Sequence, residues 1–548
     1  MSALTVGVDF GTESARALLV DAETGRELGS FVAHYPSGVI VESLPGGRRL
    51  GPDWALQAPG EWLDALERSV GGVLDTAGVP HEDVRGIGVA FTSCTVLPTT
   101  ETGSPLCALP DWADEPHAWP KLWKHHAAQP QAEELTALAE ERDEPWLARY
   151  GRVSSEWMLP KAMQALDESP SAFAAGERLV EGGDWLVWQL CGELRRNACA
   201  AGFKALWNKR DGYPSDAFLA ALRPGLAGFF SQQGAGRVVP PGDPAGLLGD
   251  EWAGRLGLSS PVSVAVAIVD AHAGLIGAGI TGAGTLYMAT GTSTCHLTLT
   301  RDERIVPGIS GTVEDGILAG HVAYEAGQAS AGDMLEWYSR TSGRPQAELT
   351  DAATRLRPGE SGLLALDWWN GCRTPLVDAD LAGALLGATL ATSPGAVYRS
   401  LLEATALGTR LVVDTFSAAG VTVDRVVAGG GLVANELMAQ IYADVSGLPV
   451  EIVGSKQPSA RGAAILAAAA AGLHDSVESA TAAAAVAPAR VVEPDARARD
   501  SYDELYGIYC GLVSALGAAG SPLKRLSALR RRVVTPRSDT LSSLPVHP

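Results

Sequence analysis

The sequence predicts an α/β protein with two to four domains. Its 548 residues are too many for one hydrophobic core, because single cores stop growing beyond about 250–300 residues. Apolar runs of strand length interleave with longer helix-like stretches along the chain, which is typical of the α/β class. One unusual loop type also occurs once in each half of the chain, which favours a two-domain arrangement.

The repeated loop joins two predicted strands through a Gly-Thr pair. An apolar run at residues 5–8 or 285–289 comes first, and a second run follows the turn. Gly11 and Gly291 can take a positive φ and let the backbone approach a ligand closely. Hydroxyl groups suited to phosphate oxygens come from Thr12, Ser14, Thr292, Ser293 and Thr294. Either copy alone fits an ordinary hairpin equally well, but the recurrence favours two phosphate-binding loops.

The other elements of the N-terminal half follow in order. Strands are predicted at residues 5–9, 14–20 and 28–34, and a helix from Pro59 to Ala77 leads to the buried-strand pattern VRGIGVAFTS. Residues 106–213 are rich in tryptophan and charged side chains, as expected of an insertion that shapes a substrate pocket. The run PVSVAVAIVDAHAG begins as a buried strand and ends at Asp270 and His272, where a helix is expected to start.

The C-terminal half opens with the second hairpin. A helix is predicted over residues 395–417, then the strand VDRVVAGGGL, then a helix over residues 435–445. Residues 476–497 are low in complexity and turn toward a loop at Pro488. The tail after Ser521 is basic and rich in serine and proline, so we expect it to fray, with a docking patch as the alternative.

Composition excludes several classes of partner. A net charge of −21 and a pI of about 4.9 argue against nucleic acid and anionic membranes, which need clustered positive charge. An anionic substrate must therefore meet backbone amides, a metal ion or individual basic side chains. The apolar run AAILAAAAAGL is too short to span a membrane and is predicted to be a buried helix.

Cysteine usage and the N-terminus predict a cytoplasmic location. The seven cysteines are odd in number and form no CxxC or zinc-like spacing, which fits reduced thiols. The segment MSALTVGVDF lacks the basic region and long apolar stretch of a secretory signal.

Several familiar motifs are rejected or absent. GAGITG at residues 277–282 satisfies GxGxxG, but a predicted helix precedes it and a strand follows, which is the reverse of the dinucleotide-binding order. The sequence contains no GxxxxGK[ST], HExxH or GxSxG. The adjacent histidines of LWKHH do not by themselves give metal-binding geometry, so we interpret this string as a pocket or domain-packing element.

Asp270 is the best candidate catalytic residue. A carboxylate at the C-terminal end of a buried strand can accept a proton from a substrate hydroxyl, which typically accelerates a reaction about 10²–10⁴-fold. Aspartate is also a favoured helix N-cap, so a structural role is the alternative. The position of Asp270 just before the second hairpin favours catalysis.

Three other positions are candidate ligand contacts. GGGLVAN follows an apolar strand and opens a helix, so its glycines would let the backbone approach a nucleotide and leave Asn435 to contact it. Lys204, in AGFKALW, could orient a sugar oxygen or developing charge, or could instead extend its ammonium toward solvent. Glu325, in YEAGQ, could accept hydrogen bonds from sugar hydroxyls or serve as a structural carboxylate.

Five short strings, taken in their order along the chain, resemble the motifs of the FGGY carbohydrate kinases: DFGT, DAHAG, MATGTSTCH, YEAGQ and GGGLVAN. The resemblance covers residues 4–515 and implies two ribonuclease H-like domains of the actin, Hsp70 and sugar kinase superfamily, with a catalytic cleft between them. It implies a sugar-binding domain at residues 1–283, a nucleotide-binding domain at residues 284–515 and a basic tail at residues 516–548. MgATP and a sugar would bind between the domains, so that catalysis depends on positioning and charge neutralisation.

A narrower set of strings resembles the ribulokinases, one branch of this family: FTSCTVLP, LWKHHAAQ, ARYGRVSSEWMLPK, AGFKALW, ALDWWNG and EATALGTR. The resemblance implies phosphorylation of L-ribulose at O5 in L-arabinose degradation, with Asp270 as the base.

Positions that match the family's motifs are expected to have specific roles. ATP would be bound by Gly11, Thr12, Gly291, Thr292, Gly332, Gly431 and Asn435. The sugar would be bound by Thr92, Ser93, Lys204, Asp270 and Glu325. Magnesium would be held near Asp9 and Asp270 through water.

Two alternatives stay open from the sequence. Another kinase of the same family, such as a xylulokinase or ribitol kinase, would share the ATP motifs and differ in its polyol. A sugar sensor or actin-like nucleotide switch would keep the fold without phosphorylating a sugar, although the presence of both Asp9 and Asp270 counts against it. A homodimer is compatible with the sequence.

Overall fold

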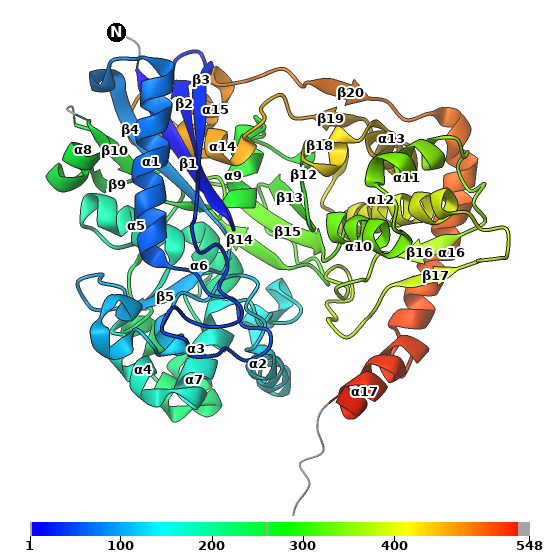
Figure 1. The fold of residues 1–548 in the computed structure, drawn as a ribbon, viewed down its shortest axis with the longest axis horizontal. Coiled ribbons are helices and arrows are strands. Elements are labelled where there is room, and N and C mark those ends of the chain that lie inside the picture. The colour runs from blue at the N-terminus through cyan, green and yellow to red at the C-terminus, as the bar shows by residue number, and fades with distance from the viewer. Residues whose placement is uncertain (1–2, 259–260, 535–548) are drawn as a thin grey trace, which may run out of the picture.

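Two seven-stranded sheets form the framework of the protein (Figure 1). The computed structural model describes residues 3–258 and 261–534. The first sheet contains β1 (Leu4–Phe10), β2 (Ser14–Asp21), β3 (Glu27–His34), β4 (Val84–Phe91), β9 (Pro244–Leu247), β10 (Ser263–Ala265) and β11 (Ile268–Val269). The second contains β12 (Gly284–Thr290), β13 (Thr294–Thr300), β14 (Gly311–Glu314), β15 (Val322–Gln328), β18 (Val423–Gly430), β19 (Val450–Ile452) and β20 (Arg490–Val492).

The two sheets repeat one topology. The first has the order β3-β2-β1-β4-β10, and the second has the matching order β15-β13-β12-β18-β19. Within each of these five-strand units, the first three strands in the written order pair antiparallel, and the last two run parallel to the central strand, β1 or β12. This duplication confirms the predicted α/β class with two related domains. We call the part built on the first sheet the N-terminal lobe and the part built on the second sheet the C-terminal lobe.

Helices surround each sheet. The N-terminal lobe has α1 (Pro59–Ala77), α5 (Gly182–Cys191), α6 (Ala198–Ala205), α8 (Asp250–Leu256) and α9 (Asp270–Gly277). The C-terminal lobe has α10 (Gly332–Ser342), α11 (Gln346–Thr354), α12 (Pro394–Ala418), α13 (Glu436–Ser446) and α16 (Arg499–Gly517). Helix α15 (Val477–Ala483) also comes from the second half of the chain but lies against the N-terminal lobe, where a Cβ on Gly242 would be 2.5 Å from Val477 Cγ2. The predicted helices at residues 59–77, 395–417 and 435–445 are therefore confirmed to within one or two residues.

Most of the insertion, residues 106–213, forms a helical extension of the N-terminal lobe, seen below the first sheet in Figure 1, whereas α5 packs in the core of the first sheet. Its helices α2 (Gln129–Glu141), α3 (Met158–Glu168) and α4 (Pro170–Ala175) pack with α7 (Asp216–Leu222) around a separate apolar cluster. Three short two-stranded sheets complete the fold: β5 (Val96–Thr99) with β6 (Arg178–Glu181), β7 (Arg195–Asn197) with β8 (Arg237–Val239), and β16 (Leu364–Leu366) with β17 (Ala384–Leu386).

Helix α14 (Pro458–Ala470) ties the lobes together, because it comes from the second half of the chain and packs on β1 and β4 of the first sheet. Glycines make this possible. A Cβ atom on Gly7 would lie 1.8 Å from the carbonyl oxygen of Ala460, and one on Gly88 would lie 2.0 Å from that of Ala463. The predicted buried Ala-rich helix is thus confirmed, and within the described residues no helix is long and apolar enough to cross a membrane.

Gly277 has a structural explanation that replaces the dinucleotide-binding interpretation. It ends α9, where a Cβ would lie 1.9 Å from the carbonyl oxygen of Pro458, and a Cβ on Gly462 of α14 would lie 1.9 Å from that of Ala273. The strand β12 follows, so GAGITG lies between a helix and a strand, as its flanks predict.

The predicted fraying after Ser521 is wrong for the described part of the tail. Residues 522–534 form α17 (Pro522–Val534), and Lys524 Nζ lies 2.6 Å from Asp378 Oδ2. Ser527 also donates a hydrogen bond of 2.6 Å to the carbonyl oxygen of Asp380. Leucine and arginine are good helix formers, and these contacts hold the helix on the C-terminal lobe. The rest of the tail lies outside the described residues.

Candidate active site

Asp9 and Asp270 occupy neighbouring strand ends in the N-terminal lobe. Asp9 lies near the end of β1, and Asp270 is the first residue of α9, directly after β11. Strands β1 and β11 both run parallel to β4, so their carboxyl ends meet at one edge of the sheet. Asp270 Oδ1 accepts a hydrogen bond of 2.7 Å from the backbone of Ala271.

The two acids have unusual protonation equilibria. Burial, helped by the negative charge of Asp9, raises the pKa of Asp270 to about 7. Burial also raises the pKa of Asp9 to about 6, although Arg16, whose Nη1 lies 3.6 Å from Asp9 Oδ2, opposes the shift. A carboxyl with a pKa near neutrality suits a general base, because it is both ionised at working pH and basic enough to take a proton.

The donor set fits a bound cation. Asp9 Oδ1 is buried and has no hydrogen-bond partner among the described residues. Within that part of the chain, no group of three or more histidine, cysteine, aspartate or glutamate side chains could hold a metal ion by itself. A pair of carboxylates with open coordination positions is what Mg²⁺ uses when substrate phosphates and water supply the remaining ligands.

The first Gly-Thr loop is the turn between β1 and β2. Gly11 donates a backbone hydrogen bond of 2.9 Å to Ser14, and Thr12 is held from two sides. Trp123 Nε1 donates to Thr12 Oγ1 at 3.1 Å, and Gln57 Nε2 donates to the Thr12 carbonyl oxygen at 2.7 Å. No local pattern predicts either support, although Trp123 belongs to LWKHH, a string that indicates a pocket or domain-packing element.

The second Gly-Thr loop is the turn between β12 and β13, as predicted. Gly332, at the start of α10, donates a backbone hydrogen bond of 3.0 Å to Gly291, and a Cβ on Gly332 would lie 2.6 Å from the same oxygen. Glycine at position 332 therefore lets α10 approach the loop. Neither Gly11 nor Gly291 has a positive φ, so the prediction that these glycines adopt one is wrong. The prediction that they let the backbone approach a ligand closely stays a prediction.

The GGGLVAN segment lies beside the second loop. Gly430 has φ +107°, and a Cβ there would lie 1.9 Å from the carbonyl oxygen of Thr290. Gly431 donates a backbone hydrogen bond of 3.1 Å to the same oxygen, and no atom lies within 4 Å of where its Cβ would be. Gly291, Thr292, Gly332 and Gly431 thus gather in one place. Asn435 caps α13, because its side chain accepts hydrogen bonds from Leu437 and Met438, so its contact with a nucleotide stays a prediction.

Lys204 and Glu325 meet from opposite lobes. Lys204 Nζ, on α6, lies 2.7 Å from both carboxylate oxygens of Glu325, on β15. Burial opposes both charges, but each group holds the other ionised: the pKa of Lys204 is raised and that of Glu325 lies well below its usual range. Lys204 is buried, so it does not extend its ammonium toward solvent.

His272 is a further member of this cluster, and no pattern in the sequence predicts a role for it. Its Nε2 lies 3.2 Å from Glu325 Oε2, and its Nδ1 has no hydrogen-bond partner among the described residues. Burial lowers the pKa of His272, so the ring is neutral. Because His272 comes two residues after Asp270 in the chain, the candidate catalytic residue lies close in sequence to a neighbour of the Lys204–Glu325 pair.

Thr92 and Ser93 follow β4, beside the end of β1. Thr92 donates a backbone hydrogen bond of 3.0 Å to Phe10, and its hydroxyl lies 3.0 Å from that of Thr95. The next residue, Cys94, has φ +57°, and its carbonyl oxygen accepts a hydrogen bond of 2.6 Å from the buried Lys161 Nζ. This lysine holds the loop from inside the insertion.

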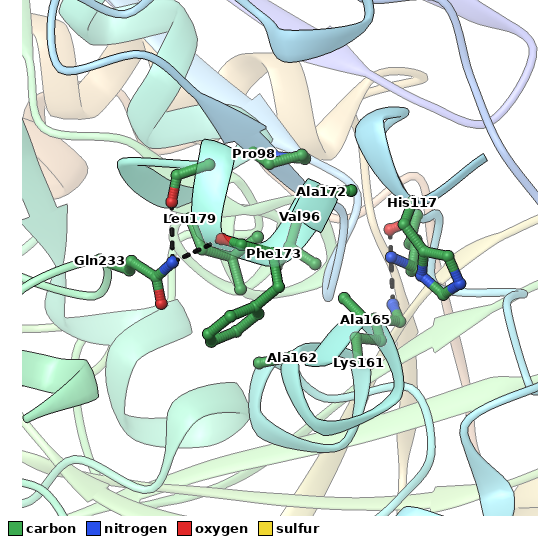
Figure 2. A pocket seen from close by; sticks show the side chains of 12 residues that line it. Val96, Pro98, His117, Lys161, Ala162, Ala165, Ala172, Phe173, Leu179 and Gln233 are labelled. Carbon is green, nitrogen blue, oxygen red and sulfur yellow. Dashed lines mark hydrogen bonds between the residues drawn. The ribbon is translucent and has the colours of Figure 1, made fainter. Parts of the chain in front are cut away.

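Lys161 also borders a small cavity of about 20 Å³ between the insertion and β5 (Figure 2). Figure 2 shows His117 and Phe173 among its lining residues, and Gln233 donates a hydrogen bond of 2.7 Å to the carbonyl oxygen of Phe173. This volume holds about one water molecule. None of the predicted site residues lines the cavity, so we do not assign the active site to it.

The chain is similar to known proteins over nearly its whole length. The ribulokinase of Shouchella clausii is 46% identical over 97% of this chain and 99% of its own length. The ribulokinase of Mycolicibacterium smegmatis is 44% identical over 98% of each chain. Among solved structures, a xylulose kinase from Rhodospirillum rubrum superposes with a TM-score of 0.76 at 23% identity, covering 94% of this chain and 99% of that one, which supports the fold.

Two family models match nearly the whole framework. The N-terminal domain of the FGGY family of carbohydrate kinases matches residues 4–277, and the C-terminal domain of that family matches residues 286–471. These matches cover both Gly-Thr loops and most strands of both sheets. The chain therefore belongs to the FGGY family of carbohydrate kinases.

Proposed function

We propose that this protein is a ribulokinase, which transfers the γ-phosphoryl group of ATP to O5 of L-ribulose in L-arabinose degradation. Full-length relatives that carry the name ribulokinase, at 44–46% identity, support this substrate. The observation that carries the chemistry is Asp270, a carboxyl of pKa about 7 at the edge where the first phosphate loop also lies. A homodimer stays a prediction.

Asp270 is the general base of the proposed reaction. Its carboxylate takes the proton of the O5 hydroxyl as O5 attacks the γ-phosphorus in line. The new bond joins O5 to phosphorus, the bond from the γ-phosphorus to the β,γ-bridging oxygen breaks, and ADP carries that electron pair away. The products are L-ribulose 5-phosphate and ADP.

The two Gly-Thr loops bind the phosphates of ATP. Backbone amides and hydroxyls at Gly11, Thr12, Gly291 and Thr292 donate to phosphate oxygens, while Gly332, Gly431 and Asn435 border the adenosine. Asp9 and Asp270 would hold Mg²⁺ through water, and this ion supplies charge neutralisation for the phosphates when bound. The free Oδ1 of Asp9 supports this assignment.

The sugar is bound by four side chains: Lys204, Glu325, Thr92 and Ser93. The Lys204–Glu325 pair offers ammonium hydrogens and carboxylate oxygens to the hydroxyl groups of a polyol, and the pair is already ionised and held in place. A preorganised polar site orients the substrate without a further cost of ordering these side chains.

A coupled assay of ADP release over a panel of sugars tests the proposal. We expect L-ribulose to give the highest kcat/KM among L-ribulose, D-ribulose, D-xylulose, L-xylulose, ribitol and glycerol, with phosphorus NMR placing the phosphate on O5. A tenfold or greater preference for D-xylulose or glycerol would overturn the substrate and leave the kinase intact. Phosphorylation of none of them would favour the sugar sensor.

A further inference from the structure

Three strings that have no specific role in the proposed reaction meet at Glu156. His126 ends LWKHH, Glu156 lies within ARYGRVSSEWMLPK, and Arg373 comes two residues after ALDWWNG. His126 Nε2 lies 3.3 Å from Glu156 Oε1, and Arg373 Nη2 donates to the same oxygen at 3.2 Å. Residues far apart in the chain therefore form one charged cluster.

This cluster joins the two lobes. His126 and Glu156 belong to the insertion of the N-terminal lobe, whereas Arg373 lies in the connection between β16 and β17 of the C-terminal lobe. The side chains of Glu156 and Arg373 are 18% and 34% exposed, so water screens the pair only in part. A contact of this kind depends on how closely the lobes approach each other.

Arg373 also lies along the strand that carries Glu325. A Cβ on Gly327 would be 3.5 Å from Arg373 Cδ and 3.9 Å from its Nη1. Residues two apart in a strand face the same side, so Arg373 lies over the face of β15 from which the Glu325 side chain projects. The arginine side chain therefore lies within van der Waals distance of the backbone of β15 at position 327.

Glu156 and Arg373 favour each other's charged forms. Burial would raise the pKa of Glu156, but Arg373 and His126 together lower it to about 2. Burial acts against the charge of Arg373, and the carboxylates of Glu156 and Glu325 favour it, so its pKa is raised. Arg373 thus interacts electrostatically with both the insertion and the proposed sugar site.

We infer that Glu156 and Arg373 form a clasp that holds the two lobes together at the sugar end of the active site. Arg373 is a positioning residue in this arrangement: anchored on Glu156, it keeps β15 against the insertion and so keeps Glu325 on Lys204. The clasp rests on the proposed function, because it assigns the sugar to the Lys204–Glu325 pair.

The test measures sugar and ATP separately in Arg373→Met and Glu156→Gln. We expect each substitution to raise the KM for the best sugar about five- to tenfold, since a partly screened ion pair is worth about 1 kcal/mol. The KM for ATP should change less than about twofold, and the double variant should be no worse than either single one. Arg373→Lys keeps the charge and should recover most of the loss, which a purely steric role would not predict.

Glu314→Gln is the matched control. Glu314 pairs with Lys209 at 3.0 Å between the same two lobes, but at the end of β14 away from Gly311, which faces Glu325 across the sheet. Its removal should leave the sugar KM unchanged. Calorimetric titration of the sugar without ATP gives a second readout, in which Arg373→Met should bind more weakly by the same factor.

The experiments distinguish a failure of the clasp from a failure of the proposed function. Any one of three results would overturn the clasp. The first is an unchanged sugar KM in Arg373→Met and Glu156→Gln, and the second is an equal rise in the KM for ATP in these variants. The third is the same rise in sugar KM in Glu314→Gln. The proposed function is judged on the unmodified protein, by which sugar it phosphorylates, so its failure does not depend on any of these variants.

Discussion

Lys204 and Glu325 reach each other from opposite lobes, with Nζ 2.7 Å from both carboxylate oxygens. The pair joins α6 of the insertion to β15 of the C-terminal sheet, so it is complete only when the two lobes are together. A polar pair that is buried and fully ionised is costly unless both partners stay in place. The Lys204–Glu325 pair lies beside His272, which comes two residues after Asp270. The pair therefore connects the lobes where we propose that the sugar binds.

Lys204→Met should lower kcat/KM for the sugar roughly 10- to 150-fold, because a charge-assisted hydrogen bond in a closed site contributes about 1.5–3 kcal/mol. The KM for ATP should change little. The variant should also melt at a lower temperature than the parent, since Glu325 is left as a buried charge without its hydrogen-bonded ammonium partner. Steady-state kinetics with both substrates and calorimetry measure these effects.

Lys209→Met is the control for Lys204→Met, because Lys209 bridges the same lobes at an exposed position. It should alter neither the sugar KM nor the melting temperature by much. Equal kinetics in parent and Lys204→Met would remove Lys204 and Glu325 from the sugar site.

Asp270→Asn should abolish phosphorylation while ATP still binds, because the amide keeps the volume of the side chain and cannot accept the proton. Fluorescence titration with a nucleotide analogue measures ATP binding independently of turnover. Turnover within a few-fold of the parent would contradict the role of Asp270 as base.

The same substitution should change stability in a pH-dependent way. The pKa of Asp270 is raised from 3.8 to about 7, so its ionisation costs the folded state stability as the pH rises through this range. Asp270→Asn removes that cost. Relative to the parent, the variant should therefore melt at a higher temperature at pH 8 and show little gain at pH 4, where the parental carboxyl is protonated. An equal gain at both pH values would mean that the pKa is not raised.

Activity should rise with pH through the pKa values of the two acids. Below pH 7, kcat/KM for the sugar should fall about tenfold per unit, because only the ionised Asp270 accepts a proton. Below pH 6 the fall should steepen, since Asp9 must also be ionised to hold a cation and its pKa is about 6. A pH–rate profile from 5 to 9 at constant ionic strength measures this, and a flat profile would contradict both assignments.

Gly11→Val and Gly291→Val should both raise the KM for MgATP, because a branched side chain would stand where phosphate must approach the backbone. The nearest atom to a Cβ added at Gly291 would be 3.9 Å away, so the folded protein has room for the first carbon and the loss should come from the ligand. Thermal melts should stay near the parental value for Gly291→Val. Gly60→Val, at the exposed start of α1 with no atom within 4 Å, serves as the control. Parental KM values for ATP in both loop variants would exclude the two-loop hypothesis.

Much of the framework could be predicted from the sequence because it depends on local patterns. The strand, turn and strand around Gly11 and around Gly291 follow from apolar runs that flank a tight turn, and α1 begins at Pro59 as its pattern predicts. The tail was mispredicted because its basic composition hid the contacts of Lys524 and Ser527 with the C-terminal lobe. A contact partner elsewhere in the chain leaves no trace in a local window.

By itself, the sequence determined the α/β class, the two loops, and Asp9, Asp270, Lys204 and Glu325 as candidates. Only the tertiary structure decided that Lys204 pairs with Glu325, that Asp9 and Asp270 share one strand-end edge with raised pKa values, and that Glu156 meets Arg373. The reason is physical: a pKa depends on burial and on charges brought close in space, and an ion pair between lobes depends on how two separately patterned sheets pack together.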